Sequence, residues 1–198
     1  MRLAAGLVIG LLLVSGQDAQ LRFTKADGDR FQTKLSKIVT VGNTPAGTRK
    51  TQQSTVVSDV EVNSYLRFQA KDQIPVGIVE PILNAQGDGI VSGRAIVDLD
   101  AVRKQKERGW LDPMGYLTGR LPLTARGRLT TQNGVGRFVL ESAELSGVTV
   151  PKSVVQELLS FYSRTPDDPD GINMDDPFEL PAQIREIRVA PGTATIVR

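Results

Sequence analysis

The amino-acid sequence predicts an α+β fold built from antiparallel hairpins and an amphipathic helix. Two stretches in the middle of the chain alternate apolar with polar residues, and each has a partner stretch beyond a turn signal. A later stretch changes to a spacing of three to four between apolar positions. The first pattern is typical of half-buried strands and the second of a helix with one apolar side. We expect the helix to cover the apolar face of the sheet, because both surfaces must be buried.

The central hairpin is expected to begin with a strand over residues 121–130, where apolar or small side chains face one side and polar side chains the other. Asn133 and Gly134 then form a tight turn, because both residue types accept a positive φ. The return strand starts at Val135. Its alternation weakens near Ser142, where we predict a β-bulge.

The amphipathic helix is predicted to follow this hairpin. Pro151 suits the first turn of a helix, where its missing N–H would have no partner. The apolar residues that then recur at helical spacing are Val154, Val155, Leu158, Leu159 and Tyr162.

Composition and charge exclude several classes of function. The chain has 198 residues, which favours one domain, and its 40% hydrophobic and 23% charged residues are ordinary for a globular protein. A net charge of +2 is too small to argue for nucleic acid as a partner. The chain has no Cys and no His, which removes disulfides, thiol nucleophiles and Ser-His-Asp catalysis. Carboxylate, Lys, Tyr or Ser-Lys chemistry remains, and we expect no enzyme activity, cofactor or metal.

The first residues have the layout of a secretory signal peptide. Arg2 is followed by an apolar run over residues 3–14 and by small residues up to Ala19. The run is too short to cross a bilayer comfortably. We expect cleavage after Gly16 or Ala19, with an uncleaved N-terminal anchor as the alternative. Residues 1–19 are therefore predicted to be an export signal, and residues 20–198 to form a single domain. We expect the protein in the periplasm or at the cell exterior.

The next part of the chain carries weaker signals. Strands are predicted at residues 20–24 and 36–41, with disorder at residues 27–30 and a polar loop over residues 42–53. A helix over residues 59–69 has a stronger signal, which comes from a capping box of Ser58 and Glu61. In a capping box each side chain accepts a hydrogen bond from the backbone N–H of the other residue.

The second hairpin is predicted over residues 75–99. Its first strand, residues 75–83, contains Pro81 and therefore belongs at a sheet edge or at a bulge. Residues 86–89 form a turn, and residues 90–99 alternate clearly between two faces.

Residues 100–119 interrupt the pattern, and we expect a partly helical excursion at one end of the sheet. A basic cluster in this segment precedes Trp110 and consists of Arg103, Lys104, Lys106 and Arg108. The cluster is either a solvated face or, together with the Trp, a contact for an anionic membrane surface.

The C-terminal part begins with residues 164–178, which are rich in Asp and Pro and are expected to form a loop. A calcium site is the alternative, although the acidic spacing does not fit an EF-hand. The tail forms a last small hairpin with Pro191 and Gly192 at its turn.

Several motifs resemble one group of exported bacterial proteins. SDVEVNSYL (residues 58–66) resembles a helix start in that group, and VSGRAIVDLD (residues 91–100) resembles its second strand pair. Residues 123–159 resemble its strand, turn, strand and helix, and IREIRVAPGTATI (residues 184–196) resembles its closing strands. The group consists of the LmeA-like phospholipid-binding proteins and the YceB-like periplasmic lipoproteins of the tubular lipid-binding (TULIP) superfamily. Beyond apolar patterns, the shared residues are Asn63, Pro151 and Gly192.

The resemblance implies a curved antiparallel sheet wrapped around a long helix, with an apolar lumen that holds an acyl chain. The candidate lining residues are Val97, Leu99, Leu121, Leu123, Leu129, Phe138, Leu140, Val155, Leu158, Leu159 and Tyr162. An ordinary closed core made of the same residues is the alternative. The chain lacks the lipidated Cys of the YceB-like members, which puts covalent membrane anchoring in doubt.

We therefore expect a non-catalytic protein that binds phospholipid or another long apolar ligand. The alternative is a structural or assembly protein of the cell envelope that binds a protein partner through exposed strand edges. A hydrolase that uses Asp98, Asp100 or Glu80 ranks last, because nothing in the sequence pairs these carboxylates.

Overall fold

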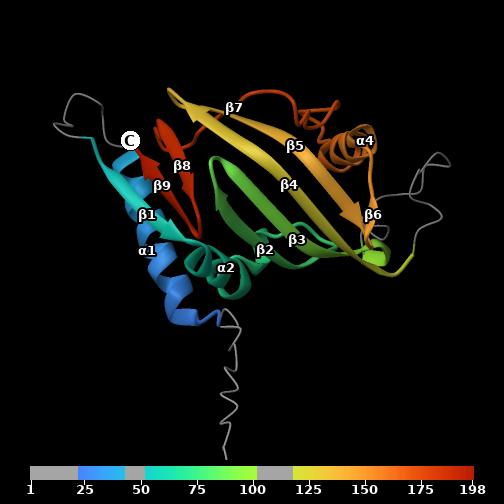
Figure 1. Cartoon of the computed structure of the whole chain (residues 1–198), viewed down its shortest axis with the longest axis horizontal. Helices are drawn as coiled ribbons and strands as arrows, with labels where there is room; N and C mark the ends of the chain where they lie inside the picture. The colour runs from blue at the N-terminus through green and yellow to red at the C-terminus, as the bar shows by residue number, and fades with distance from the viewer. Residues whose placement is uncertain (1–21, 43–51, 102–117) are drawn as a thin grey trace, which may run out of the picture.

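A computed structural model describes residues 22–42, 52–101 and 118–198 of the chain (Figure 1). Its helices are α1 (Lys25–Gly42), α2 (Asp59–Phe68) and α4 (Lys152–Ser163), and a 3-10 turn follows α2 at Lys71–Gln73. Its strands are β1 (Ser54–Ser58), β2 (Ile78–Gly87), β3 (Ile90–Asp98), β4 (Arg120–Gln132), β5 (Val135–Leu145), β6 (Val148–Thr149), β7 (Phe178–Glu179), β8 (Glu186–Ala190) and β9 (Thr193–Val197).

The strands form two antiparallel sheets. The larger sheet has the order β2-β3-β4-β5-β6, with β7 paired to β5, and the smaller sheet has the order β1-β9-β8. In Figure 1 the long strands β2 to β5 run side by side, and α1, α2 and the small sheet lie together on one side of them. The α+β class with a large antiparallel sheet is therefore confirmed.

Both predicted hairpins of the large sheet form, and their turns have the backbone that the sequence indicates. Asn133 and Gly134 join β4 to β5 with φ values of 51° and 84°. Asp88 and Gly89 join β2 to β3 with φ values of 50° and 77°. Positive φ at both central residues is what a type I′ turn requires, and this turn matches the twist of the strands on either side.

Register shifts interrupt the large sheet, and two of them lie near the predicted positions. The β4–β5 register slips at Glu141, one residue from the Ser142 at which we predicted a bulge. The β2–β3 register slips around Pro81. Since β2 is an edge strand, Pro81 lies where its missing N–H interrupts the fewest sheet bonds.

The N-terminal helix contradicts the prediction. Residues 36–41, predicted as a strand, and residues 27–30, predicted as disordered, both belong to α1. The β-branched residues of the first segment favour a strand. However, Phe31, Leu35 and Ile38 recur at helical spacing, and all three are half-buried or buried. Burial of this apolar stripe against the rest of the protein outweighs the local strand preference.

The chain on either side of α1 also differs from the prediction. Residues 22–24, part of a predicted strand, form none, and no local pattern predicted β1. β1 pairs with β9 from Ser54 opposite Val197 to Ser58 opposite Thr193. β9 was predicted as part of the C-terminal hairpin, but its pairing with a segment so far away in the sequence leaves no local signal in β1.

A cluster of buried core residues lies between α1 and the small sheet. Ile38, Leu180 and Ile184 form a buried cluster, and Ile187 and Ile196 pack against it. The cluster joins α1 to the C-terminal strands and to the segment before them. The two ends of the described chain therefore stabilise each other.

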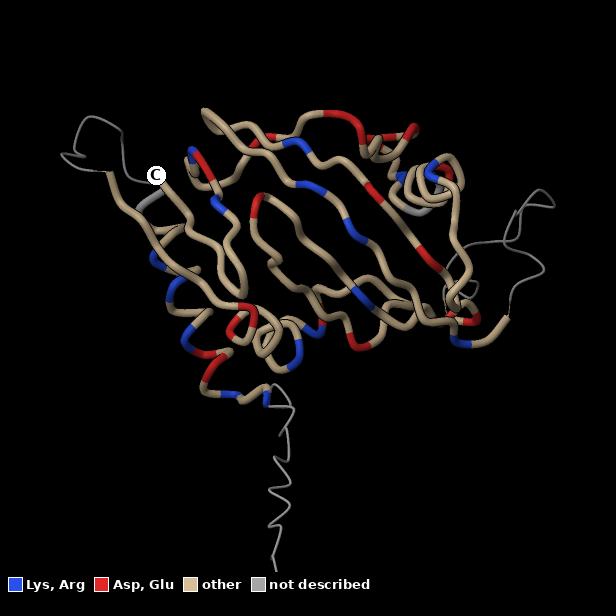
Figure 2. Tube along the Cα trace, in the orientation of Figure 1, with Lys and Arg blue, Asp and Glu red and all other residues tan. Residues whose placement is uncertain are grey.

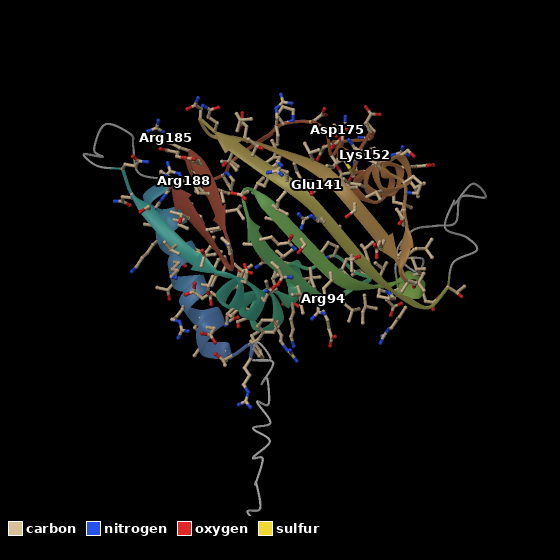
Figure 3. All side chains as sticks on the ribbon, in the orientation of Figure 1. Arg94, Glu141, Lys152, Asp175, Arg185 and Arg188 are labelled. Carbon is tan, nitrogen blue, oxygen red and sulfur yellow. The ribbon has the colours of Figure 1, made fainter. Side chains whose placement is uncertain are left out.

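α4 contacts β5, and Figure 1 shows it beside β5 and β6, away from β2 and β3. The acidic segment after it is a loop, as predicted, and the loop is fixed to the helix. Lys152 Nζ lies 2.5 Å from Asp175 Oδ1, and Figure 3 shows both residues beside α4. The Gln156 side chain donates to Ile172 O at 3.1 Å and accepts from Met174 N–H at 2.8 Å.

Candidate ligand-binding site

α2 lies at the junction of the two sheets and carries buried polar side chains. The helix begins with the predicted capping box. Glu61 N–H donates to Ser58 Oγ at 3.2 Å, and Ser58 N–H donates to Glu61 Oε2 at 2.9 Å. Glu61, Asn63 and Ser64 are all buried. Buried polar groups need hydrogen-bond partners, so the partners of these side chains identify what the helix holds in place.

Asp59 and Asn63 bind the outer edge of β2. Asn63, which is 1% exposed, donates to Leu83 O at 2.7 Å and accepts from Leu83 N–H at 2.8 Å. The Asp59 carboxylate accepts from Ala85 N–H at 3.0 Å. Four helical residues rise about 6 Å and two strand residues about 6.6 Å. Side chains four apart on α2 therefore match alternate residues of β2, and the helix takes the place of a neighbouring strand.

Gly192, in the turn between β8 and β9, closes the same edge. Its N–H donates to Ala85 O at 2.8 Å, and its carbonyl accepts from Asp59 N–H at 3.0 Å. Asn63 and Gly192 are two of the residues that carry the family resemblance. In this structure both have a structural role, because both satisfy main-chain groups of β2.

The two acidic residues of α2 have opposite electrostatic environments. Burial alone would raise the pKa of Glu61, but hydrogen bonds from Lys34 and Ser58 outweigh it and lower that pKa below its ordinary value. Lys34 Nζ lies 2.7 Å from Glu61 Oε1 and also donates to a main-chain carbonyl of β1. For Asp59, burial raises the pKa, and the N–H bond from β2 offsets only part of the shift.

A pocket of about 610 Å³ opens beside this seam, between α2, the connection after it and the start of β2. The apolar side chains of its lining include Phe23, Leu66, Ile74, Val76, Ile78 and Ile82. Arg67, Lys71 and Glu80 supply its charged side chains. Small-molecule sites typically occupy about 300–1,000 Å³ and combine apolar side chains with a few polar groups. The pocket is therefore a candidate site for a ligand with a long apolar part.

The sheet residues predicted to line the lumen lie together on one face of the large sheet. Residues directly opposite each other in an antiparallel pair share a face. The β3–β4 and β4–β5 registers thus bring together Val97, Leu121, Leu123, Leu129, Phe138 and Leu140. All six are half-buried, whereas Leu99, directly after β3, is 2% exposed. On α4, which contacts β5, Val155, Leu158 and Leu159 are half-buried.

Aromatic rings fill part of this sheet face above glycines. A Cβ atom at Gly127 would overlap the Phe138 ring and lie 2.6 Å from Val139 O. A Cβ atom at Gly136 would overlap the Phe178 ring in the same way. The glycines therefore leave the space that the two rings occupy.

The opposite face of the sheet carries charges of both signs. Figure 2 shows the basic residues of β3, β4 and β5 spread along the strands. Glu141 lies 3.1 Å from Arg126 Nε and 3.6 Å from Arg128 Nη2. Such pairing does not produce the continuous basic stripe that a nucleic-acid surface requires.

The carboxylate with the clearest local role among the hydrolase candidates is Asp98. It accepts from Ala101 N–H at 2.9 Å and from Arg120 Nε at 2.9 Å. The bond from Ala101, followed by the one from Arg120, lowers the pKa of Asp98. This environment keeps the carboxylate ionised at a chain turn. Over the described ranges, no group of three or more acidic residues is arranged to hold a metal ion.

Several predicted features lie outside the residues that the structure describes. They are the signal peptide at residues 1–19, the side chain of Tyr162, and the membrane-surface candidates Arg103, Lys104, Lys106, Arg108 and Trp110. Among the helices that the structure does describe, none is long and apolar enough to cross a bilayer.

The pocket was not predicted from the sequence. A helix over residues 59–69 and a strand at residues 75–83 were expected, but nothing linked the two. The available signal was the segment after the predicted helix, in which Ile74, Val76 and Ile78 alternate with other residues. A segment this short cannot bury three large apolar side chains by itself.

The fold and the site together define an α+β protein with a partly apolar pocket where a helix meets an edge strand. No protein-family model, curated protein or solved structure matches this chain.

Proposed function

We propose that this protein is a non-catalytic carrier of a long apolar ligand, such as the acyl chain of a phospholipid or fatty acid. The observation that supports the proposal most is the pocket between α2 and β2, with its volume of about 610 Å³ and the apolar side chains in its lining. Export through the N-terminal signal to the periplasm or the cell exterior is part of the same proposal.

Carrier function requires no reactive residue. Burying about ten methylenes of an acyl chain is worth roughly 8 kcal/mol. Ordering the ligand takes back a large share of that free energy. The remainder still allows binding in about the micromolar range. Apolar side chains are therefore sufficient for a carrier, and they form part of the lining of this pocket.

The finer fold proposal, a TULIP-like sheet wrapped around a helix, supplies a second candidate surface. This surface is the sheet face that includes Leu121, Leu129 and Phe138, to which α4 would contribute Val155 and Leu158. We rank it below the pocket, because the pocket is concave and the sheet face is partly filled by aromatic rings.

Ligand extraction and site blocking test the carrier proposal together. The purified protein is extracted with organic solvent, refolded and titrated with a fluorescent fatty acid. Val76→Trp should block the pocket, since Val76 lines it and is 51% exposed. Val139→Trp is the matched control, because Val139 is 54% exposed on the opposite face of β5 from Phe138.

The outcomes separate the two sites. Loss of uptake in Val76→Trp alone supports the pocket. A further variant, Phe138→Ala, changes the sheet face, and loss of uptake in that variant alone would place the site there. A protein that yields no lipid on extraction and takes up no probe after refolding is not a carrier.

An assembly role through strand edges is the second candidate function. It requires free edges, yet Lys34 and Glu61 bind main-chain groups at the edge of β1. Asp59 and Asn63 occupy part of the edge of β2. Crosslinking in cells that recovers one stoichiometric protein and no lipid would favour this role.

A further inference from the structure

The charged side chains of the pocket between α2 and β2 are unbalanced. Arg67 and Lys71 are the cations of its lining, and Glu80 is the carboxylate. Two positive charges and one negative charge leave a local charge of +1. In the described part of the chain, neither cation forms a salt bridge with a carboxylate.

The two cations lie at the exposed end of one wall. Asn63, Arg67 and Lys71 follow each other at intervals of four residues along α2 and the turn after it. Asn63 is buried at the seam with β2, whereas Arg67 and Lys71 are exposed. Asn63 and Arg67 lie on the same side of α2, and Lys71 lines the same pocket from the turn, so this wall passes from a buried end to a cationic mouth.

The position of Arg67 suits an anion. Its Cζ lies 5.9 Å from the centroid of the Phe68 ring, a contact that orients a guanidinium without using its N–H donors. A guanidinium can bind a carboxylate or phosphate through two N–H groups, and a Lys ammonium adds a second positive charge.

We propose that the ligand is an anionic amphiphile with a single hydrocarbon tail, an inference that rests on the carrier function proposed above. Its carboxylate or phosphate head binds Arg67 and Lys71 at the mouth of the pocket. Its tail runs inward past Leu66 and Ile78 toward Ile82. Glu80 opposes the head group and weakens its binding.

Three probes with the same tail test this proposal: decanoate, decyl phosphate and decanol. Each is titrated into the refolded full chain by displacement of a fluorescent apolar probe. Two exposed ion pairs should make at least one anion bind roughly tenfold more tightly than the alcohol at low salt. Added salt should reduce this preference, because it screens exposed charges. A preference for one anion over the other identifies the head group.

Substitutions of opposite sign at the same pocket sharpen the test. Arg67→Gln with Lys71→Gln should abolish the preference by weakening the binding of the anions more than the binding of decanol. Glu80→Gln should increase anion affinity by a few-fold. Arg185→Gln is the control, since Figure 3 shows Arg185 at the small sheet, away from α2. Circular dichroism confirms that each variant is folded.

The possible results distinguish this inference from the carrier function. If decanol binds as tightly as both anions, and the double variant changes nothing, the ligand is not anionic but the carrier function stands. If none of the three probes displaces the fluorescent probe or binds directly, both proposals fail.

Discussion

The two ends of this molecule differ in how deeply their apolar residues are buried. Around α1, α2 and the small sheet, residues such as Ile38, Val57, Leu180 and Ile184 are buried, and a buried polar network closes the seam. On the large sheet, most of the apolar face is only half-buried, and Leu83 at its edge strand is 47% exposed.

This difference in burial indicates which apolar residues contribute mainly to stability and which are available for binding. Apolar side chains that are fully buried stabilise the fold through the area that they remove from water. Apolar side chains that stay half-exposed contribute less to stability and leave surface for another molecule. The pocket lies at the border, since α2 forms one of its walls and β2 another. We therefore expect the buried end to hold the pocket in shape and the pocket to supply the binding surface.

The largest expected effect comes from truncating the buried end. Ile38→Ala should lower the free energy of unfolding by about 2–5 kcal/mol, because it leaves a cavity in the core. Leu123→Ala, on the half-buried sheet face, should cost roughly 1 kcal/mol. Urea unfolding of both variants measures the difference. Equal losses would mean that the sheet face is as closed as the core around α1.

The seam between α2 and β2 should be nearly as sensitive. Asn63→Ala leaves the N–H and carbonyl of Leu83 without their partner and should cost about 2 kcal/mol. Asn84→Ala is the control on the same strand and should change stability by less than about 0.5 kcal/mol. Hydrogen exchange at the Leu83 amide should become faster in the first variant only. An unchanged exchange rate would show that α2 does not protect this edge.

Two glycines on the same sheet face should respond differently to alanine. Gly127→Ala should destabilise the protein by about 1–3 kcal/mol, because the new methyl group would overlap the Phe138 ring and press on Val139 O. Gly93→Ala should be nearly neutral, since its Cβ would lie 3.4 Å from the nearest atom, Leu83 Cδ2. Thermal unfolding compares the two. Similar melting temperatures would mean that the ring does not fill the space above Gly127.

The smallest expected effect is a change in acid stability. The pKa of Glu61 is lowered in the folded protein, so its contribution is complete above the ordinary value of 4.5 and is lost as pH falls through the lowered value. In Lys34→Gln, the free energy of unfolding should therefore fall less steeply as pH is lowered. The change should be under about 1 kcal/mol, because Lys34 is partly exposed.

Asp59 provides the contrasting case. Its pKa is raised in the folded protein above the ordinary 3.8, so its contribution is most favourable at low pH and is lost as pH rises through the raised value. Asp59→Asn removes this low-pH contribution, so the free energy of unfolding should fall more steeply as pH is lowered. Urea unfolding at a series of acidic pH values measures both variants. Parallel curves for the two variants would contradict the opposite environments of these carboxyl groups.

Much of the large sheet could be predicted because its signals are local. Each hairpin turn is specified by two adjacent residues, Asn133 with Gly134 and Asp88 with Gly89. The alternation of apolar and polar residues then shows which face of each strand is apolar. Pro81 marks an edge because it lacks an N–H. The capping box of Ser58 and Glu61 fixes the start of α2 for the same reason, since both partners lie within one turn of helix.

The candidate site was predicted less well. The registers bring together the sheet residues from Val97 to Leu140 on one face, as the alternation implied. The pocket was missed, because its walls come from segments that carry ordinary helix and strand patterns. The strand predicted at residues 36–41 was wrong, because burial of the helically spaced Phe31, Leu35 and Ile38 outweighs the local β-propensity of that segment.

The sequence by itself determined the turns, the helix cap, the bulges and the antiparallel character of the large sheet. Only the tertiary structure decided that β1 pairs with β9, that α2 serves as a neighbour for β2, and that a pocket opens between them. The physical reason is the distance along the chain over which each interaction acts. Turns and caps join residues a few positions apart, whereas Asn63 meets Leu83 and Ser54 meets Val197 only after the chain has folded.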